Sequence, residues 1–213
     1  MNNYRIAILI TTFLRDNLLY KTLQTIIDNY SNDCIVLVAD QGYSSSEKLI
    51  TIDYFKSQIP MEYYQLPFDS GIAIAKNLLV QKASEIHISY CLVMPDSIQF
   101  KEVYNFTSLF EDLNNNILIN FKLKNVKSIE LQNIFLAKTE NLIKLWDEEM
   151  KIYDYQLAFA EYMIRGYKIS WNEDYQFIKV KCRASEEYFT YCKRLKDYQK
   201  LSLEKMEYKN AHR

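Results

Sequence analysis

The sequence predicts an α/β fold built on a mostly parallel β-sheet with helices packed against it. In residues 1–100, short runs rich in Ile, Val and Leu alternate with longer stretches whose apolar residues recur at helical spacing, the pattern of successive β-α-β units. A hydrophobic content of 49% in 213 residues allows a sizeable core. No repeat or Pro/Gly/Ser-rich linker divides the chain. We therefore expect one domain, 1–213, with a less regular part at 101–182 and a C-terminal helix at 183–213.

Four strands and three helices are expected in the regular first part. The strand candidates are apolar runs of strand length. The first helix candidate has Leu19, Leu23 and Ile26 along one stripe, and the second opens with serines, which are good N-caps. The expected strands lie at 5–10, 34–40, 61–67 and 87–94, and the expected helices at 16–30, 44–58 and 70–84.

The second part of the chain has weaker periodicity. The apolar segments before residue 140 are typical of strands, and two short segments near residue 175 are typical of a closing pair of strands. The last helix candidate, at 185–210, is rich in charged residues, which favours a solvated helix with one packed stripe. The expected strands lie at 114–123, 128–138, 167–171 and 175–181, and the expected helices at 139–150, 154–166 and 185–210.

Charge and composition exclude several classes of function. The 26 Lys and Arg nearly balance the 27 Asp and Glu, so no overall field favours nucleic acid or an acidic membrane. The apolar stretch at 6–10 is too short for a signal peptide or a membrane span. The four cysteines show neither CxxC spacing nor histidine neighbours. We expect the thiols to be reduced and the protein to be cytoplasmic. It would be either dissolved in the cytoplasm or peripheral at the inner face of the membrane.

Polar residues come directly after the carboxyl ends of several expected strands. In an open α/β sheet, ligands bind outside the carboxyl ends of the strands. Each residue by itself also suits a turn or a helix cap, but their common placement favours a site. Gly71 is one of only three glycines and falls in a loop of this edge. The candidate site residues are Thr11, Thr12, Arg15, Asp40, Gly71, Lys76, Asn77 and Asp96.

Such an edge suits a nucleotide diphosphate. Asp40 can accept from a base N–H or a ribose hydroxyl, while Arg15 and Lys76 can offset phosphate charge. The dinucleotide-binding alternative is weaker, because no GxGxxG motif follows the first strand and no Walker A loop occurs.

Four segments, in order, carry a more specific signal: IAILITTFLRDNLLYKTLQTI, CIVLVADQG, DSGIAIAKNLLVQKA and LVMPDSIQF. They resemble the nucleotide-sugar-binding half of family 2-like glycosyltransferases with the A-type (GT-A) fold. The resemblance implies that Asp40 contacts the base and that Lys76-Asn77 replaces an Arg-Asn pair. It also implies that Pro95-Asp96-Ser97 stands where a metal-binding Asp-x-Asp motif belongs. Asp96 is then the remaining carboxylate ligand for Mn²⁺ or Mg²⁺.

The segment from Phe135 to Trp171 resembles the acceptor side of the same enzymes. Aligned on Trp146-Asp147 and Gly166-Tyr167-Lys168, it places Asp154 at the position of the catalytic base. An inverting transfer needs a carboxylate that takes the proton of the acceptor hydroxyl. Lys181 or Arg183 could neutralise the leaving diphosphate, and Tyr153 and Tyr155 flank the base.

The resemblance implies a glycosyltransferase that moves a sugar from a nucleotide diphosphate sugar, first of all a UDP-sugar, to a hydroxyl acceptor. A growing bacterial surface glycan or its lipid-linked precursor would be the acceptor. Residues 1–100 would bind the donor and 101–182 would face the acceptor. Pro95, Ser97 and Leu157 favour an alternative, a non-catalytic relative that binds a nucleotide sugar or a partner enzyme. A homo-oligomer formed through the C-terminal helix stays open, and a nucleic-acid partner is not expected.

Overall fold

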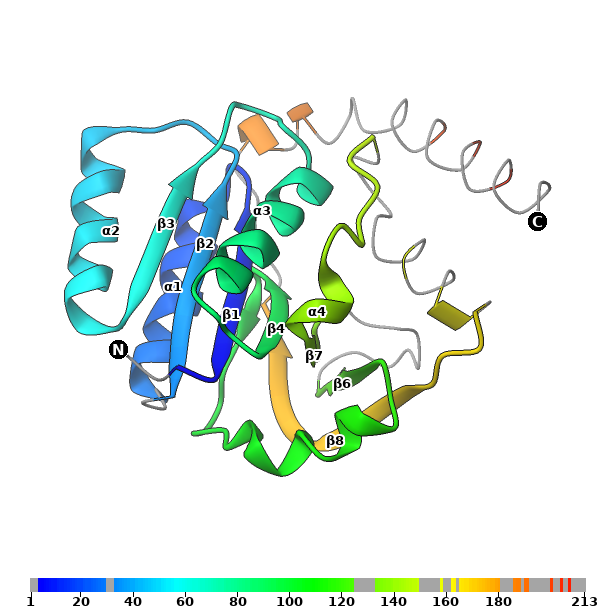
Figure 1. Ribbon diagram of the computed structural model, residues 1–213. Coiled ribbons are helices and arrows are strands. Elements are labelled where there is room, and N and C mark those ends of the chain that lie inside the picture. The colour runs from blue at the N-terminus through cyan, green and yellow to red at the C-terminus, as the bar shows by residue number, and fades with distance from the viewer. Residues whose placement is uncertain are drawn as a thin grey trace.

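The computed structural model describes residues 4–29, 33–124, 133–149, 158, 162–163, 165–180, 186–188, 190–191, 200, 204 and 207. Its centre is one twisted sheet with helices on both faces (Figure 1). The strand order is β3-β2-β1-β4-β7-β6-β8-β5. The strands are β1 (Ile6–Thr12), β2 (Cys34–Asp40), β3 (Met61–Gln65), β4 (Tyr90–Pro95), β5 (Ile98–Gln99), β6 (Leu118–Leu123), β7 (Phe135–Lys138) and β8 (Ile169–Lys179).

Strands β3, β2, β1 and β4 are parallel, as the alternating pattern of the first hundred residues predicts. Every residue of β1 and β2 is buried, which explains their continuous apolar sequences, because helices cover both faces of a parallel sheet. The register pairs Thr12 with Asp40 and Thr11 with Pro95. The ends of three strands therefore meet at one edge, and the loops that follow them lie side by side.

Two layers of helices complete the core. Helices α1 (Asp16–Asp28) and α2 (Ser46–Gln58) pack on the face formed by Ile6, Ile8 and Ile10. Helix α3 (Ile72–Glu85) packs on the opposite face through small residues and Leu79. The Ser45 hydroxyl accepts from the backbone N–H of Lys48 at 3.1 Å and caps α2, as its serines predicted.

The second part of the chain extends the sheet with mixed pairing. β7 is antiparallel to both β4 and β6, whereas β8 is parallel to β6. Two short 3₁₀ helices, η1 (Phe106–Leu109) and η2 (Asp112–Asn114), lead into β6. Neither they nor β5 were predicted from the sequence, because segments of two to four residues carry no readable periodicity.

The prediction of two separate strands at 167–171 and 175–181 is wrong. Residues 169–179 form one strand, β8, which pairs with β6 and then, at its end, with β5. Asn172 lies where the turn was expected, and its Oδ1 accepts from the backbone N–H groups of Asp174 and Tyr175, each at 3.1 Å. The polar residues thus form an irregularity inside the strand rather than a hairpin.

The predicted helix 139–150 is also wrong beyond its first turn. Helix α4 spans only Thr139–Leu142, and Lys144 has a positive φ of 53°. Asn77 of α3 explains the stop, because its amide donates to the Trp146 carbonyl at 2.8 Å and accepts from the Trp146 N–H at 3.3 Å. A neighbouring helix therefore takes the backbone groups that a continuing helix would use.

Within the described ranges, none of the helices has the length and apolar character needed to cross a membrane. The expected helices 154–166 and 185–210 fall mostly outside the described residues, although those that are described at 158, 162–163, 186–188 and 190–191 are helical.

Candidate nucleotide-sugar site

A pocket of about 140 Å³ lies at the carboxyl ends of β1 and β2. It is the edge of the sheet where the sequence predicted a ligand. The β1–α1, β2–α2 and β3–α3 loops supply most of its wall, and two tyrosines from the C-terminal part of the chain complete it. Its lining residues are Thr11, Thr12, Phe13, Arg15, Gln41, Asp69, Gly71, Ile72, Tyr188 and Tyr191.

Arg15 and Asp96 form an ion pair at this edge of the sheet. Arg15 lies just before α1, and its Nη2 is 2.6 Å from Asp96 Oδ1. The Thr12 hydroxyl donates to Asp96 Oδ2 at 2.7 Å, and the Thr22 hydroxyl donates to the Asp96 carbonyl at 2.7 Å. Asp96 is therefore fixed to both β1 and α1. The Arg15 side chain retains 23% exposure and lines the pocket.

Burial controls the ionisation of Asp96, which has no exposed surface. Loss of hydration raises the pKa of this carboxyl to about 6, although the charge of Arg15 and the Thr12 hydroxyl both act to lower it. Asp96 thus changes charge near pH 6. When it is ionised, it neutralises the guanidinium of Arg15.

Asp40 is also fully buried and is held by three groups. Its Oδ1 accepts from the Gly42 N–H at 2.7 Å, and its Oδ2 accepts from the Tyr63 hydroxyl at 2.7 Å. Lys48 of α2 forms an ion pair with the same Oδ2. Asp40 is absent from the pocket lining, so here it holds β2, β3 and α2 together, and its contact with the base stays a prediction.

Lys48 is buried and forms a second ion pair, with Asp16 at 2.7 Å. Burial alone would lower the pKa of Lys48, but the carboxylates of Asp16 and Asp40 outweigh it and raise that pKa. Burial and the hydrogen bond to Asp40 raise the pKa of the Tyr63 hydroxyl strongly. At neutral pH, therefore, Lys48 carries its positive charge and the Tyr63 hydroxyl stays protonated.

The amino end of α3 faces the pocket through Gly71 and Ile72. Gly71 has φ 106° and ψ 142°, a conformation that residues with a Cβ rarely adopt. Its N–H donates to Gln41 Oε1 at 2.8 Å. This bond ties the β3–α3 loop to the β2–α2 loop and directs the positive end of the α3 dipole toward the pocket.

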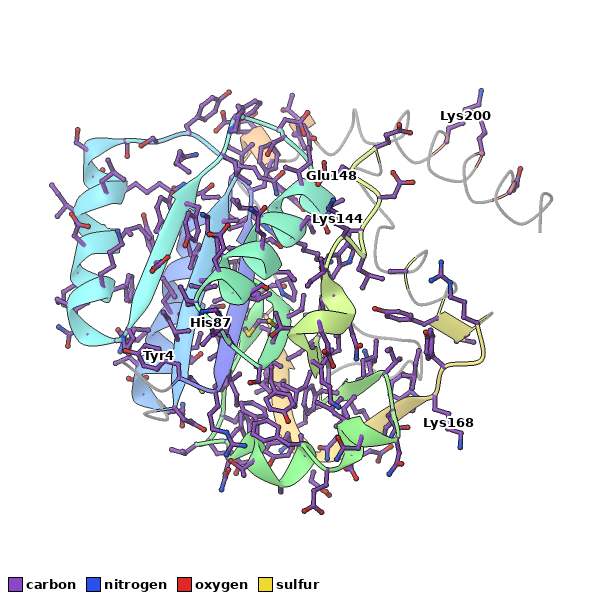
Figure 2. All side chains as sticks on the ribbon, viewed as in Figure 1. Tyr4, His87, Lys144, Glu148, Lys168 and Lys200 are labelled. Carbon is purple, nitrogen blue, oxygen red and sulfur yellow. The ribbon has the colours of Figure 1, made fainter. Side chains whose placement is uncertain are left out.

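Lys76 and Asn77 lie apart from this pocket lining, although the sequence predicted them in the site. Lys76 is buried, donates to Asn133 Oδ1 at 3.1 Å and lies 5.3 Å from the centre of the Trp146 ring. Asn77 holds the Trp146 backbone and also donates to Glu148 Oε1 at 3.0 Å. Figure 2 shows Glu148 and Lys144 on the segment beside α3. Both residues therefore connect α3 to the segment around Trp146, and their place in the site stays a prediction.

The described carboxylates do not fit a divalent-metal site. Asp96 is buried and paired with Arg15, and Pro95 and Ser97 offer no second carboxylate. Within the described ranges, no three His, Cys, Asp or Glu side chains are grouped so that they could hold a metal ion. Mn²⁺ or Mg²⁺ needs several oxygen ligands, which this edge does not supply from its described residues.

Several predicted functional residues lie outside the described part of the chain. They are Asp154, the predicted base, its neighbours Tyr153 and Tyr155, and the cations Lys181 and Arg183. Sequence reasoning in turn missed Phe13, Gln41, Tyr188 and Tyr191 in the pocket and Lys48 and Tyr63 beside Asp40. Only Gln41 had a local signal, its position directly after the predicted strand end.

No protein-family model matches this chain. No curated protein matches it either. Solved structures do, at low sequence identity. Staphylococcus aureus TarS 1–349 in complex with UDP-GlcNAc matches with a TM-score of 0.64 and 14% identity over 84% of this chain. The mannosyltransferase PcManGT from Pyrobaculum calidifontis, in complex with GDP-Man and Mn²⁺, matches with a TM-score of 0.70 and 11% identity over 87%. GalNAc-T7 with UDP, GalNAc and Mn²⁺ matches with a TM-score of 0.63 and 10% identity over 84% of this chain.

These matches show that the chain has a GT-A-like glycosyltransferase fold, which confirms the predicted fold class. The chain spans 60%, 59% and 44% of the three structures, respectively. At this identity the likeness concerns the fold, since one fold carries many activities.

Proposed function

We propose that the chain is a glycosyltransferase that binds a nucleotide diphosphate sugar at the carboxyl ends of β1 and β2. The pocket at this edge, with Arg15 and the amino end of α3 in its wall, carries the proposal. Structures of the same fold hold UDP-GlcNAc, GDP-Man or UDP, which supports a nucleotide sugar as the ligand class. The resemblance of the sequence favours a UDP-sugar.

Arg15 and α3 supply the positive charge in this proposal. A guanidinium forms two parallel hydrogen bonds to phosphate oxygens, and a helix amino end attracts anions. The Thr11 and Thr12 side chains are hydroxyl groups in the same wall. Asp40 reaches the base or ribose if Tyr63 or Lys48 releases one of its oxygens.

Asp154 is the proposed catalytic base, on the resemblance of its segment. The acceptor hydroxyl gives its proton to the Asp154 carboxylate as its oxygen attacks the anomeric carbon. The bond from that carbon to the diphosphate breaks, and its electron pair leaves with the phosphate oxygen, so the configuration inverts. The acceptor, a bacterial surface glycan or its lipid-linked precursor, rests on the same resemblance.

A panel of donors tests the proposal. The purified protein is incubated with UDP-, GDP- and CDP-sugars, with and without Mn²⁺, and release of the free sugar is measured. We expect hydrolysis of one donor class above the rate without protein, and saturable binding of its nucleoside diphosphate. Lack of binding and hydrolysis with every donor would contradict the proposed function.

One observation favours a second candidate, a non-catalytic relative that binds a nucleotide sugar. Asp96, at the expected metal position, is buried against Arg15 and Thr12. In the donor panel this candidate predicts saturable binding without any turnover, and the transferase proposal predicts both.

Replacement of Asp154 tests the base separately. Asp154→Asn keeps nearly the same shape but cannot accept a proton, so we expect transfer to fall by roughly a hundredfold or more. Donor binding and thermal unfolding should be unchanged, because asparagine also caps helices well. Glu148→Gln, a change at a described carboxylate outside the pocket, serves as the matched control. Equal transfer rates of wild type and Asp154→Asn would rule out this base.

A further inference from the structure

The C-terminal part of the chain returns to the donor pocket. Figure 1 shows the short pieces 186–188 and 190–191, in orange, at the carboxyl ends of β1 and β2. Tyr188 and Tyr191 from these pieces line the pocket. Residues 186–188 and 190–191 together form a short strap across this edge of the sheet.

Both tyrosines contact groups that the nucleotide would need. The Arg15 guanidinium carbon lies over the Tyr188 ring, 5.2 Å from its centre, a distance at which the cation and the ring attract each other. The Tyr191 ring meets Phe13 edge-on at 4.5 Å between ring centres, and its hydroxyl donates to Asp69 Oδ1. The strap is thereby attached to both the β1–α1 loop and the β3–α3 loop.

The space left in the pocket is small. Its volume is about 140 Å³, whereas pockets that hold drug-sized ligands measure roughly 300–1,000 Å³. A nucleoside diphosphate belongs to the larger class. Arg15 already pairs with Asp96, and its guanidinium carbon lies over the Tyr188 ring, so a diphosphate that reaches Arg15 enters space that the strap now partly fills.

Charge also opposes simultaneous occupancy. Glu186 and Glu187 are exposed and belong to the same helical turn as Tyr188. They give the strap two negative charges, and a diphosphate is also negative. Like charges repel, so these two carboxylates favour separation of the strap from a bound diphosphate.

We propose that the strap is an autoinhibitory element that occupies part of the donor pocket and leaves it when a nucleotide binds. This inference rests on the proposed nucleotide site. Binding then requires a pocket state in which Tyr188 has left Arg15, and the apparent dissociation constant is the intrinsic one divided by the fraction of open molecules.

The test uses the full chain and three variants. Tyr188→Ala removes the ring beneath the Arg15 guanidinium, Tyr191→Ala removes the contacts with Phe13 and Asp69, and Tyr191→Phe removes the hydroxyl bond to Asp69 but keeps the ring. Tyr54→Ala is the matched control, because Tyr54 is an exposed tyrosine of α2 outside the pocket lining. Affinity and association rate are measured with UDP, GDP and CDP, and hydrogen exchange is followed in the peptide that covers 186–191.

We expect Tyr188→Ala and Tyr191→Ala to bind the preferred nucleotide on the order of fivefold more tightly and to associate faster. Tyr191→Phe should show a smaller gain, and Tyr54→Ala none. In the wild type, nucleotide should speed exchange in the 186–191 peptide while it slows exchange in the peptide that holds Thr12 and Arg15.

Weaker or unchanged nucleotide binding in both alanine variants would overturn the autoinhibitory proposal. Slower hydrogen exchange at 186–191 in the presence of nucleotide would also overturn it, because the tyrosines would then be part of the binding wall. Absence of nucleotide binding by the wild type and by every variant would instead contradict the proposed function, and the strap proposal would fail with it. The two failures are thus distinguishable.

Discussion

The Arg15–Asp96 ion pair determines the charge that the donor pocket presents. Arg15 precedes the first helix and Asp96 follows the fourth strand, and the register of β1 and β4 brings them to 2.6 Å. Because Asp96 is completely buried, its ionised form depends on Arg15 and Thr12. The guanidinium acts on a ligand with its full charge only when Asp96 is neutral.

Donor binding should therefore depend on pH through Asp96. Its pKa is raised to about 6 by burial, so the carboxyl is ionised above this pH and protonated below it. We expect the affinity for UDP-glucose to rise by a few-fold as the pH falls from about 7.5 to about 5, because protonation removes the counter-charge of Arg15. UDP-glucose is the ligand of choice, since its diphosphate has no ionisation near this range.

Asp96→Asn serves as the control for this pH dependence. The variant cannot ionise at this position, so its affinity should be nearly independent of pH and close to that of the wild type at low pH. A pH profile that is identical in the wild type and in Asp96→Asn, measured by calorimetry, would show that another group is responsible.

Lys48 is the residue on which the Asp40 network depends. It is buried between Asp40 and Asp16, so Lys48→Met leaves a fully buried carboxylate without its cation. We expect a loss of about 3 kcal/mol in the free energy of unfolding, measured by urea denaturation, as is usual when one partner of a buried pair is removed. Lys48→Met combined with Asp40→Asn should recover part of it.

The matched control for Lys48 is Lys56→Met on the same helix. Lys56 is exposed and pairs with Asp53 at 3.9 Å, so its replacement should change the free energy of unfolding by less than about 0.5 kcal/mol. Equal losses for the two lysines would mean that the Asp40 network adds no stability.

At the scale of elements, α3 connects the two sides of the candidate site. Its amino end forms part of the pocket through Gly71, and its first turns hold the Trp146 segment through Asn77. The same helix therefore positions both the pocket wall and the Trp146 segment, which leads toward the predicted acceptor side. Changes at one end of α3 can reach the other through a rigid element.

Asn77→Ala should loosen this connection. The backbone N–H and carbonyl of Trp146 both lose a partner, so we expect a loss of about 1–2 kcal/mol in the free energy of unfolding. The near-ultraviolet circular dichroism of the tryptophans should also change. Gln81→Ala, an exposed position of α3 that bonds only to Glu85 among its described partners, should do neither. Similar losses for both variants would contradict the role of Asn77.

At the scale of the whole molecule, no three His, Cys, Asp or Glu side chains among the described residues are grouped as a metal site would require, and Asp96 is paired with Arg15. We expect that chelation with EDTA leaves most of the nucleotide affinity intact, because Arg15 and the α3 amino end carry the positive charge. Titration calorimetry with and without Mn²⁺ measures this. Binding that is abolished by EDTA and restored by Mn²⁺ would show that carboxylates outside the described residues join Asp96.

The sequence by itself determined the parallel part of the fold and the edge of the sheet at which the candidate pocket lies. Continuous apolar runs such as Ile6–Ile10 require cover on both faces, and parallel strands place their ends at one edge. From these local rules Thr11, Thr12, Arg15, Gly71 and Asp96 were predicted together, and the structure places the first four in the pocket wall and Asp96 beside Arg15.

Only the tertiary structure decided how the charged and aromatic residues are paired. Lys48 and Asp40 meet because α2 packs on β2, and Asn77 ends the predicted helix at 139–150 because α3 reaches Trp146. Tyr188 arrives at Arg15 from more than 170 residues away. Such contacts depend on packing between distant segments, and no periodicity, cap or turn signal in one segment contains that information, because these signals reflect local backbone preferences.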